Sequence, residues 1–117
     1  MPYQSLLDGL MRAVPGGRGA LLLDQTGELV LASGSPDHSQ HLLGAYQGIA
    51  LAALLKVAAR YQVGPVEYVL CRYQNGHVIL RPLRDGYYLV FSLMPDADVP
   101  RGLRHSALAQ SRLNQVL

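Results

Sequence analysis

The sequence has little that could support chemistry of its own. Cys71 is the single cysteine in 117 residues, which excludes an internal disulfide and a multi-cysteine zinc site and favours a reducing, cytoplasmic location. The phosphate-binding patterns G-x-x-x-x-G-K-[ST] and G-x-G-x-x-G after a strand are both absent. We therefore expect no nucleotide site, no cofactor and no enzymatic activity.

Charged residues are also scarce. They make up 15% of the chain, whereas an ordinary soluble domain has about 25%. Hydrophobic residues make up 50%, so apolar surface is expected to remain after the core is filled, either at an oligomer interface or in a loose tail. The net charge is +2 and the ten basic residues are scattered along the sequence, so nucleic acid is not an expected partner.

Segments for export or membrane insertion are not expected either. The first eleven residues have neither the basic start nor the apolar run of a signal peptide. The longest apolar stretch, residues 42–59, is interrupted by Gln47, Lys56 and two glycines, which makes it a poor membrane span. A length of 117 residues fits one domain, residues 1–117, with one hydrophobic core.

Few side chains suggest a chemical site. His38 and His41 lie near the expected start of a helix and could share a metal, but no third ligand follows at a recognisable spacing. Cys71 alternates with Val69 and Tyr73 on one side of an expected strand, where a lone cysteine is more often a small core residue than a nucleophile. We expect no catalytic residue and no metal site.

Hydrophobic spacing and turn residues predict an α/β domain with the order helix, two strands, long helix, three strands, helix. Glycine-containing turns separate the strands at 25–27, at Asn75-Gly76 and at Asp85-Gly86. The expected strands are 19–24, 28–33, 67–73, 77–83 and 87–93, and the expected helices are 3–14, about 40–62 and about 103–117. The strand pair and the meander are expected to share one sheet, with the long helix as the crossover.

The long helix is apolar on two sides. One side is predicted to pack on the sheet and comprises Leu43, Tyr46, Ala50, Ala53, Leu54, Val57 and Tyr61. The other is predicted to bind a partner and comprises Gly44, Gly48, Leu51, Ala52, Leu55 and Ala59. One sheet covers only one side of a helix, so something else must cover the second, either a partner or the 33–39 loop of the same chain. Glycine within a helix costs about 1 kcal/mol relative to alanine, so the glycines indicate a packing role.

Three stretches, which are residues 20–32, the long helix and residues 78–90, resemble the Roadblock/dynein light chain family, and within it the MglB-type regulators of Ras-like GTPases in cell polarity. Residues 20–32 form an apolar strand, a D-x-x-G turn and a second strand ending in small residues. The long helix is rich in small residues, and residues 78–90 form a strand, a short turn with glycine and another apolar strand. The resemblance covers nearly the whole chain, and its motifs are structural.

The resemblance implies a five-stranded antiparallel sheet with the first and last helices on one face and the long helix on the other. It also implies a homodimer in which the long helices lie side by side and the 67–73 strands pair across a two-fold axis. The implied dimer interface comprises Glu67, Val69, Cys71, Tyr73 and Leu55. Family members of this type bind a small GTPase on the paired helices.

The expected function is a homodimeric, non-enzymatic regulator that modulates GTP hydrolysis or the nucleotide state of a Ras-like GTPase, for example as a GTPase-activating protein. One alternative is a dimeric adaptor, alone or with a paralogue, that leaves GTPase rates unchanged. Another is a small-molecule sensor with a ligand between helix and sheet, although Tyr46, Leu54 and Tyr61 are expected to fill that space.

Overall fold

The computed structural model describes residues 2–34 and 38–117, and the side chains of these residues except those of 38–47. The elements in chain order are α1 (Pro2–Ala13), β1 (Gly17–Leu23), β2 (Leu29–Gly34), α2 (His38–Tyr61), β3 (Val69–Tyr73), β4 (Gly76–Pro82), the 3-10 turn η1 (Arg84–Gly86), β5 (Tyr88–Leu93) and α3 (Val99–Val116). This order confirms the predicted sequence of helices and strands.

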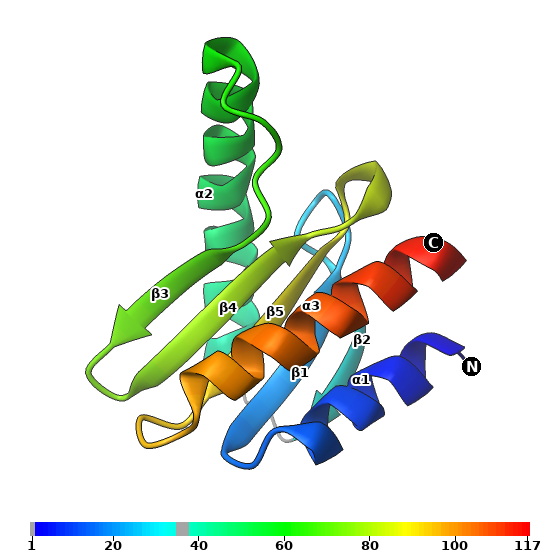
Figure 1. Ribbon diagram of the computed structural model, residues 1–117, viewed down its shortest axis with the longest axis vertical. Coiled ribbons are helices and arrows are strands. Elements are labelled where there is room, and N and C mark those ends of the chain that lie inside the picture. The colour runs from blue at the N-terminus through cyan, green and yellow to red at the C-terminus, as the bar shows by residue number, and fades with distance from the viewer. Residues whose placement is uncertain (1, 35–37) are drawn as a thin grey trace.

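All five strands form one antiparallel sheet in the order β2-β1-β5-β4-β3 (Figure 1). The predicted hairpin and meander meet where β1 pairs with β5, with Leu21 opposite Val90. The long helix α2 is the crossover between the β2 edge and the β3 edge. The fold class is therefore the predicted mixed α/β arrangement.

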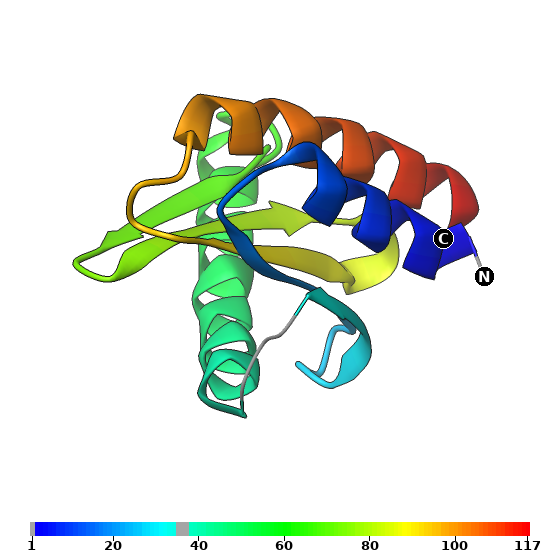
Figure 2. The same ribbon diagram turned by 90° about the horizontal axis from the view of Figure 1, so that it is seen from below.

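The helices cover the two faces of the sheet as the resemblance implied. α1 and α3 lie on one face and α2 on the other (Figure 2). Alternation along β4 sends Ile79 to the α1/α3 side and Leu80 to the α2 side, so each face has its own core. The core under α1 and α3 includes Phe91 and Leu113, both fully buried.

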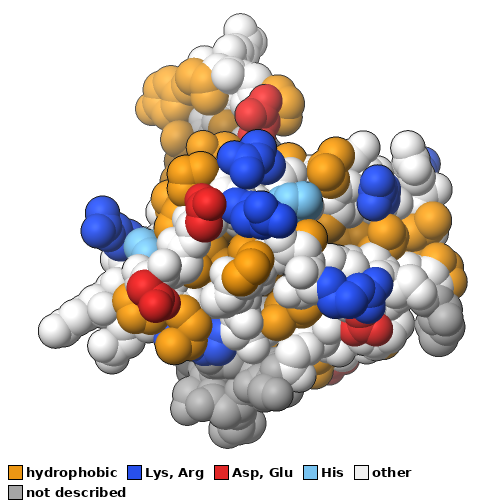
Figure 3. Space-filling view, turned by 60° about the horizontal axis from the view of Figure 1, so that its bottom comes forward, with side chains coloured by type: hydrophobic (Ala, Val, Ile, Leu, Met, Phe, Trp, Pro, Cys, Tyr) orange, Lys and Arg blue, Asp and Glu red, His pale blue; other side chains and the backbone are white. Residues whose placement is uncertain are grey.

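α1 and α3 lie side by side and antiparallel. Tyr3 near the start of α1 donates a hydrogen bond to the carbonyl of Val116 at the end of α3, at 2.8 Å. At the opposite end, Nε of Arg101 donates to the carbonyl of Ala13, at 2.7 Å. Basic and apolar side chains share the outer surface of this helix pair (Figure 3).

Most element boundaries differ from the expectation by one or two residues, and two of the differences bear on the site. α3 begins at Val99, earlier than predicted, because the carboxylate of Asp98 accepts a hydrogen bond from the Arg101 N–H and proline occupies the first turn. The strand predicted at 67–73 begins at Val69, so Glu67 lies in the connection before β3. The predicted capping residue Asp37 and the Ser39 side chain lie outside the described residues.

Candidate partner-binding surface

α2 contacts the sheet through a narrow stripe of its surface. Gly48 and Leu51 fall on this side, and Leu51 is only 3% exposed in the core with Tyr88. A Cβ atom built on Gly48 would overlap the hydroxyl oxygen and Cζ of Tyr88 and lie 2.9 Å from its Cε1. The absence of a side chain at Gly48 thus allows α2 to rest on the Tyr88 ring.

Burial also affects the Tyr88 hydroxyl. It raises the pKa of Tyr88 above the ordinary value for tyrosine, and the nearby Asp24 carboxylate acts in the same direction. Asp24 itself stays ionised because hydrogen bonds from the side chain and backbone of Thr26 and from the Glu28 N–H lower its pKa. Tyr88 is therefore a neutral contact for α2 at physiological pH.

The predicted orientation of α2 is wrong. The residues expected to face the sheet are exposed, namely Ala50, Ala53, Leu54, Val57 and Tyr61, while the side chains of Leu43 and Tyr46 lie outside the described residues. Gly48 and Leu51, expected on the outer side, face the sheet instead. α2 is apolar all round, so hydrophobicity alone does not select a side, whereas the space taken by Tyr88 does.

The side of α2 predicted to bind a partner borders a groove of about 880 Å³. Gly48, Leu51, Ala52 and Leu55 line it, together with the Pro65–Glu67 connection, the β4–β5 turn and one side of α3. Ala59 lines an adjoining hollow of about 260 Å³ with Leu55. Gly44 belongs to residues 38–47, whose side chains are not described. The groove floor is thus buried within the chain, and its rim at Ala52, Leu55 and Ala59 is open.

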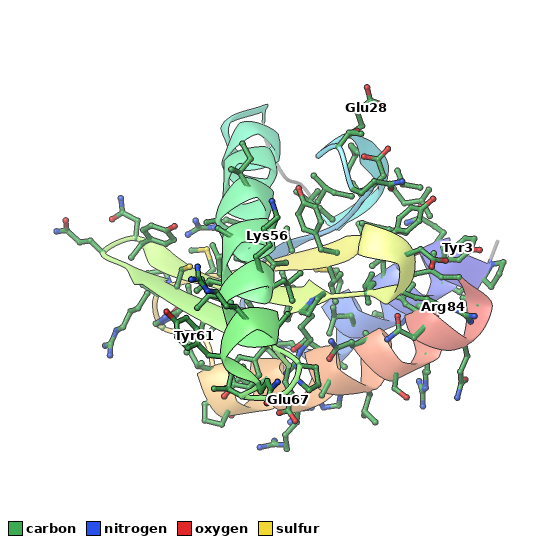
Figure 4. The ribbon with its side chains drawn as sticks, turned by 90° about the horizontal axis from the view of Figure 1, so that it is seen from above. Tyr3, Glu28, Lys56, Tyr61, Glu67 and Arg84 are labelled. Carbon is green, nitrogen blue, oxygen red and sulfur yellow. The ribbon has the colours of Figure 1, made fainter. Side chains whose placement is uncertain are left out.

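The opposite flank of α2 forms an apolar row. Ala50, Leu54, Val57 and Tyr61 recur at steps of four, three and four residues, a spacing typical of helices that pack side by side. Val57 is 54% exposed and Tyr61 is 67% exposed. Figure 4 shows Tyr61 on the side of α2 toward the β3–β4 hairpin. We call these four residues the α2 row.

β3 is an edge strand of the sheet. Among the described residues it stands last in the strand order, and its ladder partner in the sheet is β4. Leu70 and Tyr73 are exposed, while Val69 and Cys71 are half-buried against the core beneath α2. An exposed edge strand and an exposed apolar helix row are both features that a second chain could cover.

Arg81 anchors the connection between α2 and β3. Its guanidinium is buried on the α3 side of β4 and donates to the Ser106 hydroxyl at 2.9 Å and to the carbonyl of Leu103 at 2.9 Å. It also bonds the Gln110 side chain at 3.1 Å and the carbonyl of Glu67 at 3.4 Å. Burial lowers the pKa of Arg81, and nearby Tyr68 and Glu67 oppose that shift.

Arg81→Met should lower the free energy of unfolding by about 2 kcal/mol, because it removes four hydrogen bonds of a buried guanidinium and leaves the Gln110 side-chain oxygen without that donor. Chemical denaturation followed by circular dichroism measures this change. Arg104→Met, at an exposed position of α3, is the control and should shift the same quantity by less than about 0.5 kcal/mol. Equal effects of the two substitutions would show that the Arg81 contacts do not hold the groove wall.

The described residues show no chemical centre. Among them, no three His, Cys, Asp or Glu side chains come together in a way that could hold a metal ion. His77 is buried with its Nε2 atom 3.3 Å from the Pro95 carbonyl, and the side chains of His38 and His41 are not among those described. No helix in the described part of the chain is long and apolar enough to cross a membrane.

Solved structures share this fold. Myxococcus xanthus MglB superposes with a TM-score of 0.85 at 13% identity, covering 97% of this chain and 93% of that chain. The gliding protein mglB of Thermus thermophilus gives 0.85 at 16% identity, covering 98% and 87%. A Roadblock/LC7 domain from Streptomyces avermitilis gives 0.76 at 22% identity, covering 96% and 95%.

Comparison of the sequence itself gives one family match. No curated protein sequence matched the chain. The model of the Roadblock/LC7 domain, however, matches residues 3–92, which include the β1–β2 hairpin, the whole of α2 and the β3–β4 hairpin. Together with the sheet order and the placement of the helices, this match makes the chain a member of the Roadblock/LC7 domain family.

Proposed function

We propose that the chain is a homodimeric, non-enzymatic regulator of a Ras-like small GTPase. The observation that carries the proposal is that two apolar features are exposed in the single chain, the α2 row and the edge strand β3. A monomer would leave both features in water, whereas a two-fold dimer covers helix and strand edge in one step. A small regulatory or adaptor role also fits the family and the MglB neighbours.

In the proposed dimer, the β3 strands pair across the two-fold axis and the α2 rows face each other. Val69, Cys71 and Tyr73 then lie in the paired strands. Leu54, Val57 and Tyr61 supply the helix contact in place of Leu55, which lies on the groove side of α2. Glu67 precedes β3 and is not part of the paired strands in this dimer. Its carbonyl accepts hydrogen bonds from Arg81 and Gln110 of the same chain.

The GTPase is proposed to dock across the paired α2 helices, on the groove rims at Ala52, Leu55 and Ala59. The GTPase would carry the nucleotide, the magnesium ion and the catalytic residues, and the dimer would hold its switch regions in one arrangement. Stabilising that arrangement by about 3 to 4 kcal/mol changes hydrolysis by roughly two to three orders of magnitude. No side chain from this protein has to enter the active site.

GTP turnover by a Ras-like GTPase, measured with and without the protein, tests this function. We expect binding and a change in turnover or nucleotide exchange of at least about tenfold, which needs only about 1.4 kcal/mol. The purified protein alone should neither hydrolyse GTP nor bind it tightly. Binding without any change in rate would identify the adaptor alternative, and GTP hydrolysis by the protein alone would contradict the proposed division of roles.

The groove supports a second candidate function, small-molecule binding. Its volume of about 880 Å³ lies within the range of about 300–1,000 Å³ typical of ligand sites. Leu54 and Tyr61, expected to fill this space, are exposed instead. Native mass spectrometry of the protein purified under mild conditions should reveal a bound compound if this candidate is correct, and Ala52→Trp should exclude it from the groove.

A further inference from the structure

The outer surface of α3 carries a basic stripe. Successive residues of an α-helix are rotated by about 100° about its axis, and this rotation places five residues of α3 on one side of the helix. They are Arg101, Arg104, His105, Leu108 and Arg112. Figure 3 shows basic side chains over this helix pair, on the face of the sheet opposite α2. The stripe therefore stays uncovered in the dimer proposed above.

Acidic side chains offset this stripe only in part. α3 contains no Asp or Glu, and Asp98 before it caps the helix by accepting from the Arg101 N–H. α1 adds Arg12 in its last turn. Its one acid, Asp8, accepts hydrogen bonds from Ser33 at 2.5 Å and Gln4 at 3.0 Å, which with Arg12 hold its pKa below the usual range. The fold thus gathers four of ten basic residues on one face.

A shallow groove runs between α1 and α3 beneath the arginines. Its volume is about 140 Å³, and small residues at Gly9, Ala13 and Ala109 leave the space open. Leu108, which is 51% exposed, stands at its border beside Arg112. A Cβ atom on Gly9, which lines the groove, would lie 3.8 Å from a terminal nitrogen of Arg12, so the Arg12 guanidinium lies near Gly9.

We propose that this face binds an acidic amphipathic helix of a partner protein. Apolar side chains of such a helix would enter the groove beside Leu108, and its carboxylates would lie on the surrounding arginines. An anionic bilayer fits less well, because the surface is hollowed and Leu108 is the one large apolar side chain in the stripe, whereas membrane-binding faces insert several. The inference does not depend on GTPase binding.

A synthetic peptide tests the proposal on the full-length chain. The probe is a fluorescein-labelled helix of about 18 residues, the length of α3, with leucine at helical spacing and glutamate elsewhere. We expect an anisotropy increase that weakens as salt shortens the Debye length. A twin peptide with lysine in place of glutamate should not bind.

Variants locate the binding face. Arg104→Glu/Arg112→Glu should weaken binding of the acidic peptide by about tenfold or more, since two attractive pairs become repulsive. Lys56→Glu/Arg60→Glu on α2 makes the same change in net charge on exposed residues and should leave the affinity unchanged. Arg104→Gln/Arg112→Gln removes the two positive charges without adding negative ones and should also weaken peptide binding. Thermal unfolding of every variant shows whether a loss of binding reflects a loss of folding.

Three results would overturn the proposal. The first is that the acidic peptide does not bind, and the second is that the α3 and α2 variants lose peptide affinity equally. The third is that the protein co-sediments with vesicles of anionic phospholipid in a way that depends on Arg104 and Arg112, while the peptide fails to bind. That result would show that this surface binds membranes.

Discussion

Replacing Gly48 with leucine should lower the free energy of unfolding by about 3 kcal/mol, although leucine is the better helix former. The reason is the Tyr88 ring, which already occupies the position of a Cβ atom on Gly48. The helix must then lift from the sheet or the ring must leave a core in which Leu51 and Val90 surround it. Urea denaturation of the purified variant measures the change.

Two comparisons isolate this contact. Ala52→Leu, one turn further along α2 and exposed, should change stability by less than about 0.5 kcal/mol. In a double-mutant cycle, Tyr88→Ala should remove at least about 1 kcal/mol of the cost of Gly48→Leu, because the ring no longer opposes the new side chain. If Gly48→Leu were as stable as Ala52→Leu, α2 would rest on the sheet by a different side.

Val57→Glu/Tyr61→Glu should convert a dimer into a monomer. In the proposed dimer the two substitutions bring four carboxylates together between the helices, and like charges at an interface cost several kcal/mol. The dissociation constant should therefore rise at least about a hundredfold. Both side chains are more than half exposed in the single chain, so the monomer should keep its circular dichroism spectrum.

A matched pair on α3 controls for the added charge. Ser111→Glu/Gln115→Glu places two glutamates at the same spacing of four residues, on exposed positions of the opposite face. Sedimentation velocity should show that this variant remains dimeric at concentrations where Val57→Glu/Tyr61→Glu has dissociated. A dimer that tolerates both pairs would place the interface away from the α2 row.

Local chemistry explains why the fold was largely predictable. Turns with glycine mark the hairpins, and Asp24 accepts the hydrogen bonds that close the first one. At the η1 turn, Asp85 and Gly86 both adopt positive φ, as an Asp-Gly pair readily does. Alternation along the strands then assigns each side chain to a face. The early start of α3 was missed because its cap lies in a proline-flanked loop.

The surfaces could not be predicted equally well. The sheet side of α2 depends on Tyr88, which lies forty positions after Gly48 and gives no local signal. The groove wall includes Arg81 and Gln110, which meet only in the folded chain. The basic face likewise joins Arg12 to arginines near the other end of the sequence. In each case the deciding contacts are long-range, whereas periodicity reports only on near neighbours.

Sedimentation equilibrium of the purified protein at micromolar concentration tests the central claim most directly, because the regulator proposed here acts as a dimer through α2 and β3. We expect a mass of about twice 12.7 kDa, converted to 12.7 kDa by Val57→Glu/Tyr61→Glu. A wild-type protein that sediments as a 12.7 kDa monomer throughout this range would contradict the account.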